Sequence, residues 1–209
     1  VLILDANPDV TSKGPLFKKA WADLYKGTLE YRSQHKAVAV DAKTNTVKFD
    51  VQDDVKADVL NVLPTMRAGD LAVATGLANA NARWCHVNFL DFESTAAKDV
   101  HVIGDSIQVA TGMPKSGHMA NAQAKVTAAA IVAELQGLEI NPQPMLTNVC
   151  LSYVDQAQAI HVASVHEYLH DKKSFFPVAG SGGVSAVRSA QEAKNAEAWA
   201  HNIWADTLK

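Results

Sequence analysis

The segment that ends in Gly104 and Asp105 is the first candidate for binding chemistry. We predict a buried strand over His101–Ile103, closed by this Gly-Asp pair and followed by a loop and a long helix. An aspartate in that place can accept hydrogen bonds from sugar or ribityl hydroxyls, and the N-terminus of the next helix favours an anion or an electron-rich ring edge. The alternative from the residues alone is an ordinary turn, in which Asp105 binds no ligand.

Two cysteines, Cys85 and Cys150, could carry sulfur chemistry. They lie far apart, form neither a CxxC redox motif nor a zinc-binding pattern, and are too few for a disulfide framework. A cysteine that takes part in thiol–disulfide exchange needs an accessible sulfur and a stabilised leaving thiolate. The alternative for each is the role of a small buried hydrophobic residue. The residues alone leave both readings open.

The elements that position these candidates are predicted from hydrophobic spacing and from turn residues. Helices are predicted at Pro15–Lys26, Arg67–Thr75, about Met119–Leu135 and about Ala186–Ala205. Strands are predicted at Val1–Asp5, Ala37–Asp41, Thr46–Asp50, Asp58–Leu63, His101–Ile103, Asn148–Val154, Ala159–His166 and Phe175–Val178. The mixture of strands and helices indicates an α/β protein.

Composition excludes several other classes of function. The chain has 209 residues, of which 48% are hydrophobic and 20% charged, as in an ordinary globular protein. A net charge of -3 gives no basic face for nucleic acid. No apolar run approaches the roughly 20 residues that cross a bilayer. His161, His166 and His170 have the wrong spacing for a metal site, and Gly180–Gly183 is interpreted as a turn.

The first residues have the pattern of a dinucleotide-binding unit. Val1–Asp5 is an apolar strand that ends in an acid, as does the second strand of such a βαβ unit. The glycine-rich turn of the motif lies about 20 residues before that acid, which here falls before residue 1. We therefore expect the sequence to begin inside a domain. Asp5 alone is only a hint of ribose binding.

Several runs along the chain together resemble one protein family, the flavoprotein subunit of flavocytochrome c sulfide dehydrogenase. The matching runs are Trp84–Val87, Phe92–Ser94, Val100–Asp105, Met113–His118, Ala120–Val126, Asn148–Ser152 and Ala196–Ile203. An upstream match at Asn61–Pro64 and Ala68–Gly69 extends the resemblance over essentially the whole chain. The chain then corresponds to the C-terminal half of a longer family member.

The resemblance implies a fold class and a domain plan. The fold class is α/β: a partial FAD/NAD(P)-binding Rossmann-like fold with two dinucleotide domains, similar to glutathione reductase, plus a C-terminal α+β interface domain. Residues 1–65 would form a partial NAD(P)-like domain, and residues 66–138 the returning part of the FAD-binding domain. Residues 139–209 would cover the flavin and meet a partner.

The resemblance also implies an activity and its cofactors. The expected function is oxidation of sulfide through a redox-active disulfide and FAD, with electrons passed to a c-type cytochrome subunit that carries haem c. The missing N-terminal half of the same flavoprotein would hold FAD covalently, and the location would be the periplasm. We expect no nucleic-acid partner, no membrane span and no metal bound by this chain.

Family motifs map onto particular residues of this sequence. Cys150 corresponds to one half of the redox-active disulfide and is the expected catalytic residue, with its partner cysteine in the other half of the polypeptide. Cys85 matches a different cysteine of the family and is interpreted as structural. The expected flavin-binding residues are Gly104, Asp105, Met113, Pro114, Lys115 and Trp199.

Departures from the family pattern leave alternatives open. His86, Asn88, His118 and Leu151 stand where the family has other residues, which bears on substrate and rate rather than on fold. The alternative enzyme is a sulfide:quinone oxidoreductase, which also uses a redox-active disulfide. Its usual apolar C-terminal membrane anchor is not matched by the charged last helix of this chain. The alternative from another class is a truncated, non-catalytic fragment that acts as an interaction module.

Overall fold

The computed structural model describes residues 1–208 and divides them into two compact units. The first unit contains Val1–Thr65, Tyr153–Ile160 and Ser185–Ala193. The second contains Met66–Ser152, His161–Val184 and, of the described residues, 194–208. The division into three domains at residues 65 and 138 stays a prediction.

In the first unit, a short parallel pair of strands flanks a helix. β1 (Leu2–Leu4) pairs with β2 (Glu30–Arg32), and α1 (Gly14–Leu24) connects them. The helix was predicted at Pro15–Lys26. Pro15 falls in the first turn of α1, where the N–H that proline lacks would have no intrahelical acceptor, so no hydrogen bond is lost. Ala20 on α1 is fully buried against Val154 and Ile160. The helix thereby forms a small core with residues far away in the sequence.

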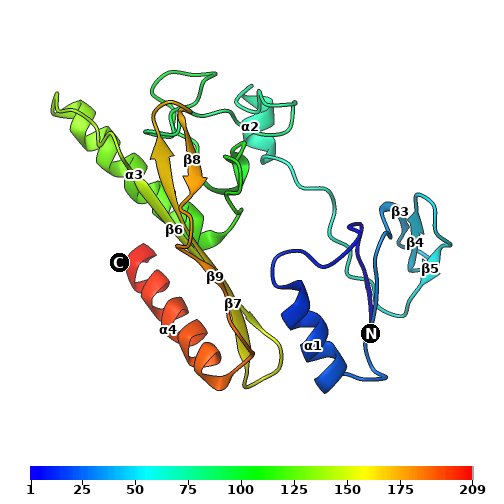
Figure 1. The fold of residues 1–209 in the computed structure, drawn as a ribbon. Helices are drawn as coiled ribbons and strands as arrows, with labels where there is room; N and C mark the ends of the chain where they lie inside the picture. Colours follow the sequence, from blue (N-terminus) through cyan, green and yellow to red (C-terminus); the bar gives the residue numbers. More distant parts are fainter. Residues whose placement is uncertain (209) are drawn as a thin grey trace. The chain divides into compact units, whose positions relative to one another are not determined.

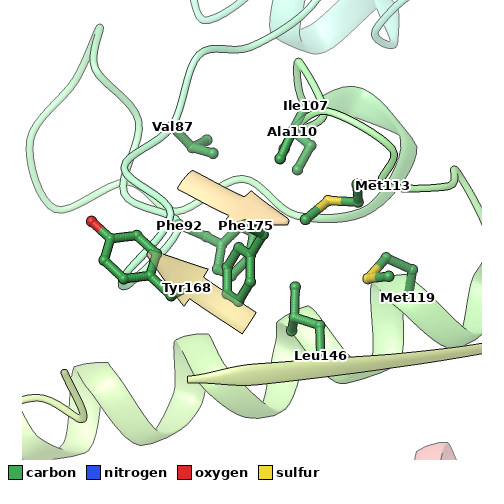
Figure 2. Close-up of a cluster of buried hydrophobic side chains, with 9 residues drawn as sticks. All are labelled: Val87, Phe92, Ile107, Ala110, Met113, Met119, Leu146, Tyr168 and Phe175. Carbon is green, nitrogen blue, oxygen red and sulfur yellow. The ribbon is translucent and has the colours of Figure 1, made fainter. Parts of the chain in front are cut away.

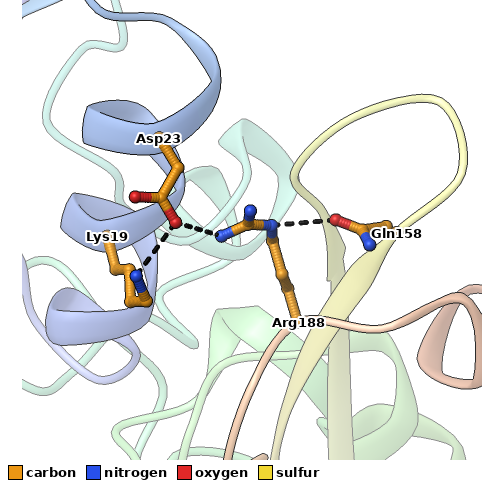
Figure 3. Close-up of polar contacts among 4 residues, drawn as sticks. All are labelled: Lys19, Asp23, Gln158 and Arg188. Carbon is orange, nitrogen blue, oxygen red and sulfur yellow. Dashed lines mark hydrogen bonds and ion pairs between the residues drawn. The ribbon is translucent and has the colours of Figure 1, made fainter.

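A polar network also ties α1 to distant segments of the first unit. Asp23 accepts hydrogen bonds from Lys19 Nζ at 3.0 Å and from an Arg188 terminal nitrogen at 2.8 Å, and Arg188 Nε donates to Gln158 Oε1 at 2.8 Å (Figure 3). The hydrogen bond from Arg188, followed by that from Lys19, lowers the pKa of Asp23.

The predicted hairpin of the first unit is confirmed, but the strand predicted beside it is wrong. β3 (Ala37–Asp41) and β4 (Thr46–Phe49) pair antiparallel, and the third strand is β5 (Val55–Lys56). The predicted strand at Asp58–Leu63 is absent from the described residues, because the edge of β4 is already paired with β5.

The second unit combines a sheet with two long helices (Figure 1). The strand order is β6 (Met145–Tyr153), β7 (Ala159–Leu169) and β8 (Ser174–Pro177), with β9 (Gly183–Val184) pairing with β7. The helices are α2 (Asp70–Ala74), α3 (Gly117–Leu135) and α4 (Ala190–Thr207). β6, β7 and α4 each contribute residues to both units. No described helix has both the length and the hydropathy needed to span a membrane.

The core of the second unit is aromatic and aliphatic. Phe92 and Phe175 are completely buried and stack with ring centroids 6.2 Å apart. Leu146 of β6 and Met119 of α3 close the same cluster (Figure 2). Burying aromatic rings of this size contributes strongly to stability, so this cluster fixes the start of α3 against the sheet.

Two predicted boundaries near the candidate site are wrong. His101–Ile103 is not a strand: it makes one isolated bridge, Glu93 to His101, and a 3-10 helix follows at Gly104–Ser106. Ile103 is 36% exposed, because in the described chain this segment pairs only with the short run at residues 92–94 and no sheet covers it. The last helix begins at Ala190 rather than near Ala186, because Ser189 pairs with Ala159.

Candidate functional site

The N-terminus of α3 is the structural centre of the candidate site. Ser116 is the N-cap residue, and its Oγ accepts a hydrogen bond from the Met119 backbone N–H at 3.1 Å. The first amides of a helix have no intrahelical acceptor, so those of Gly117 and His118 remain for other acceptors. A helix start with this cap favours a negative charge or an electron-rich group.

The Gly104–Asp105 turn lies against α3. Gly104 has φ +71°, in the left-handed region that favours glycine, and a Cβ there would lie 3.4 Å from the Ala120 Cβ. Its backbone N–H donates to Gln123 Oε1 at 2.6 Å. The Gln123 amide nitrogen in turn contacts Met113 Sδ at 3.4 Å. The turn, the helix and the loop before the helix are thereby held together.

Lys115 holds the same turn from the other side. Its Nζ donates to the carbonyl oxygens of Asp105 at 2.6 Å and Ile107 at 2.8 Å. It also lies 3.7 Å from the centroid of the Trp84 ring, in cation–π range. Burial lowers the pKa of Lys115, whereas the charge of Asp105 acts in the opposite direction. The Asp105 side chain itself is exposed.

Asn148 connects the cap of α3 to Cys150. Asn148 and Cys150 are two residues apart on β6, so both side chains lie on one face of the strand. Asn148 Oδ1 accepts from Ser116 Oγ at 2.5 Å and from Cys150 Sγ at 3.5 Å. Asn148 is 4% exposed, whereas Cys150 is half-buried. The Cys150 sulfur is thus linked through one amide to the first turn of α3.

His118 makes a second connection at the same helix start. Its Nδ1 accepts from the Val149 backbone N–H at 3.1 Å and from Trp199 Nε1 at 3.4 Å. Both donors require an unprotonated Nδ1, which assigns the ring hydrogen to Nε2. Burial lowers the pKa of His118, and the positive charge of Lys125 acts in the same direction.

These contacts place the predicted site residues relative to one another. Gly104, Asp105 and Lys115 meet in one turn; Cys150 joins the helix start through Asn148, and Trp199 joins it through His118. The Met113 side chain lies in the buried core cluster, with only its sulfur on Gln123. Pro114 is half-buried directly before Lys115.

Sequence reasoning missed the connecting roles of Asn148, His118 and Trp84. A signal was present for Asn148, since it stands at the spacing of two from Cys150 on a predicted strand. Nothing in the sequence indicated the partners of His118, which are 31 and 81 residues away.

Cys85 lies inside the fold beside this site. It is completely buried, and its backbone pairs with Ser106 and Gln108 at 2.9 and 2.8 Å. Burial raises the pKa of its thiol, which keeps it protonated and unreactive. In the described part of the chain, no disulfide joins Cys85 to Cys150.

The carboxylate of Asp5, which the sequence suggested as a ribose-binding group, accepts hydrogen bonds from neighbouring residues. It accepts from the Asn7 backbone N–H at 2.9 Å, from Asn7 Nδ2 at 2.9 Å and from the Tyr31 hydroxyl at 3.0 Å. Burial alone would raise the pKa of Asp5, but these hydrogen bonds outweigh it and lower the pKa. Among residues 1–208, no cluster of three or more His, Cys, Asp or Glu side chains could hold a metal ion.

Solved structures similar to this chain show its fold. A sulfide:quinone oxidoreductase from Aquifex aeolicus matches with a TM-score of 0.70 and 14% identity, over 95% of this chain and 48% of that chain. A chain of the Tetrahymena thermophila mitochondrial ATP synthase structure matches with a TM-score of 0.57 and 18% identity, over 78% of this chain and 40% of that chain. This chain therefore spans about half the length of the structures it matches. The likeness shows the fold of this chain, an α/β Rossmann-like fold shared with the sulfide:quinone oxidoreductase structure.

Two family models give the family. The model described as the central part of the sulfide dehydrogenase (flavocytochrome c) flavoprotein chain matches residues 1–64. The model described as the flavin-binding part of flavocytochrome c sulphide dehydrogenase matches residues 142–208. The two matches lie at opposite ends of the chain and together cover more than half of it. The chain belongs to the family of flavocytochrome c sulfide dehydrogenase flavoprotein chains, and the resemblance seen in the sequence is confirmed.

The donor set at the start of α3 fits a flavin. An exposed carboxylate on Asp105 suits hydroxyl donors, and the amides of Gly117 and His118 suit the electron-rich edge of a ring. The aromatic ring of Trp199, 6.1 Å from the His118 ring, adds an apolar surface at the same helix start.

Proposed function

We propose that this chain supplies one wall of the flavin site in a sulfide dehydrogenase that delivers electrons to a c-type cytochrome subunit. The observation that carries the proposal is the link from the N-cap of α3 through Asn148 to the Cys150 sulfur. It joins a half-buried thiol to the helix start that fits an isoalloxazine edge. Membership of the flavocytochrome c family supports sulfide as the substrate and a haem c subunit as the partner.

The protein side of the flavin site is assigned to a few residues of this chain. Asp105 would bind hydroxyl groups of the ribityl chain, and Gly104 allows the turn that presents it. Lys115 fixes the turn rather than contacting the flavin with its charge, because its Nζ is already used by two carbonyls and the Trp84 ring. When bound, FAD would supply two-electron acceptance from sulfur and one-electron release to haem.

Cys150 is assigned the sulfur chemistry. In the oxidised enzyme it would form a disulfide with a cysteine outside this chain. Hydrosulfide attacks one sulfur of that disulfide, so that a new S–S bond forms as a persulfide while the old S–S bond breaks and the other cysteine leaves as a thiolate. The proton of hydrosulfide passes to solvent. The half-buried position of Cys150 gives a small anion access to the bond.

The partners and the location are part of the same proposal. The remainder of the flavoprotein would complete the cofactor site and hold FAD covalently, and the c-type cytochrome would accept the electrons. A periplasmic location is supported by the family membership alone.

The replacement Cys150→Ser in the complete flavoprotein, assembled with its cytochrome subunit, tests this function. We expect sulfide-dependent haem reduction to fall to background while the flavin absorbance near 450 nm is retained, because serine cannot form the disulfide. Cys85→Ala is the matched control, since Cys85 is fully buried and lies outside the proposed chemistry. It should keep most of the activity. Activity retained by Cys150→Ser would remove Cys150 from its role.

A further inference from the structure

Asn148 occupies a position from which one side chain serves two different donors. Its Oδ1 accepts from the hydroxyl of Ser116 at 2.5 Å and from the thiol of Cys150 at 3.5 Å. The residue is 4% exposed, so water cannot readily replace either contact. A buried acceptor shared by a helix cap and a thiol responds to any change in the protonation or oxidation of that thiol.

We propose that Asn148 is a positioning residue whose side-chain amide reorients with the state of Cys150. It turns its oxygen to the thiol and its nitrogen to the thiolate. The inference rests on the proposed redox role of Cys150, which passes through the thiolate in each turnover. In this proposal Asn148 stabilises both the thiol and the thiolate of Cys150. Its hydrogen bond with Ser116, at the start of α3, then changes with the state of the sulfur.

The chemistry of the amide group is what allows this exchange. A thiol donates one hydrogen bond, whereas a thiolate only accepts. An amide carries an acceptor and a donor on one carbon, and a half-turn about its last side-chain bond exchanges them. Aspartate would offer two acceptors and would repel an anionic sulfur, and leucine would offer nothing. An amide of this size can therefore follow both forms of Cys150 from the same backbone position.

Ser116 can accommodate either orientation of the amide. Its hydroxyl carries one donor and two acceptor sites. It uses one acceptor for the Met119 backbone N–H, which caps α3. When Asn148 presents its oxygen, Ser116 donates to it, and when Asn148 presents its nitrogen, the second acceptor of Ser116 is available. Ser116 therefore caps α3 in both states, whereas the hydrogen bond between Ser116 and Asn148 reverses its direction.

Three other ionisable groups lie near this helix start. Lys115, directly before the N-cap Ser116, has a pKa lowered by burial. His118 accepts from the Val149 backbone N–H and has a lowered pKa, so it is neutral in alkaline solution. Lys125, whose charge acts on His118, pairs with Asp206 at 2.7 Å. A pH-dependent change at Asn148 that disappears in Cys150→Ser therefore depends on the sulfur, whereas a change that persists in Cys150→Ser comes from these neighbours.

Alkylation of Cys150 by iodoacetamide in mildly alkaline buffer gives the first test, followed by peptide mass to separate Cys150 from buried Cys85. It is carried out on the complete flavoprotein after reduction, because Cys150 in the oxidised enzyme would be in a disulfide and only the free thiolate reacts with iodoacetamide. In Asn148→Asp we expect the rate to fall about tenfold, because a carboxylate opposes the thiolate that reacts. In Asn148→Leu we expect a fall of about threefold, because the thiolate loses its donor.

A matched control removes a helix cap elsewhere. Ser189 caps α4 by accepting from the Glu192 backbone N–H at 3.2 Å. Ser189→Ala loses a similar capping bond in the other unit and should be alkylated at Cys150 within about twofold of the wild-type rate. A wild-type rate in Asn148→Asp, or an equal slowing in Ser189→Ala, would overturn the proposal.

A second measurement needs no variant at Asn148. The side-chain amide protons of Asn148 are followed by NMR in reduced, labelled protein as the pH is raised in alkaline buffer. We expect them to move downfield as the amide begins to donate to the anionic sulfur, and to stay in place in Cys150→Ser. Unmoved signals in the wild-type protein overturn the proposal, even where the Asn148 variants do not fold. Neither measurement uses sulfide or cytochrome, so the proposal can fail while the proposed function stands, and a failure of haem reduction leaves these results unaffected.

Discussion

At the scale of single residues, His118 offers a sharp test of the site geometry. Its Nδ1 accepts two N–H groups and its pKa is lowered by burial and by Lys125. The unfolded chain therefore binds a proton at His118 more readily than the folded chain does. The stability that results is complete above the unfolded pKa of about 6.5 and is lost as the pH falls below it.

We expect His118→Asn to reduce this pH dependence. The Oδ1 of asparagine can take the place of Nδ1 as acceptor but does not titrate. Between pH 7.5 and 5.5 the wild-type melting temperature should fall by roughly a few degrees, and the variant should lose less. Part of the fall should remain, because burial also lowers the pKa of His166.

The exposed His201 provides the control for this prediction. Its ring lies at the surface of α4 beside Trp204, and His201→Asn should leave the pH profile of the melting temperature unchanged. A profile for His118→Asn that is identical to the wild-type profile would contradict the assigned environment of His118.

The sequence was informative about which residues could carry chemistry, and less so about how they are linked. Asp105 and Cys150 could be singled out as candidates from their types and from motif context. The link between Ser116 and Cys150 could not, because it passes through Asn148 across 32 residues of chain. Such contacts depend on tertiary packing, which one-dimensional spacing does not encode.

At the scale of elements, the cap of α3 determines how firmly the site is held. Ser116 satisfies the Met119 backbone N–H and contacts Asn148 on the neighbouring strand. We expect Ser116→Ala to destabilise the chain by about 1 kcal/mol, as for other N-cap serines. Ser116→Thr keeps the hydroxyl and should cost much less. Urea denaturation measures both, and equal free energies of unfolding for Ser116→Ala and the wild type would contradict the cap.

The accuracy of the predicted elements follows from how local their causes are. α1 and α3 were predicted closely because apolar residues and, in α1, a first-turn proline act within the helix itself. The strand predicted at His101–Ile103 was wrong because a strand depends on partners elsewhere. In the described residues that segment has only one isolated bridge.

At the scale of the whole molecule, the α/β fold class was predictable but the two compact units were not. Tyr153–Ile160 and Ser185–Ala193 join the unit formed by the first 65 residues, although they are distant in sequence. One contact that joins these segments is the hydrogen bond from the Tyr25 hydroxyl to the Val154 carbonyl, at 2.8 Å and across 129 residues of sequence. Hydrophobic spacing predicts elements one at a time, and such returns of the chain leave no periodic signal.

The central claim is that this chain forms part of a flavin-containing sulfide dehydrogenase rather than a module without cofactor. The most direct measurement is the intact mass and visible absorbance of the native material. The account predicts a flavoprotein heavier than 22.4 kDa, or this chain together with a second one. In either case the material carries the mass increment of covalent FAD and absorbs near 450 nm. A bare 22.4 kDa species without that absorbance would contradict it.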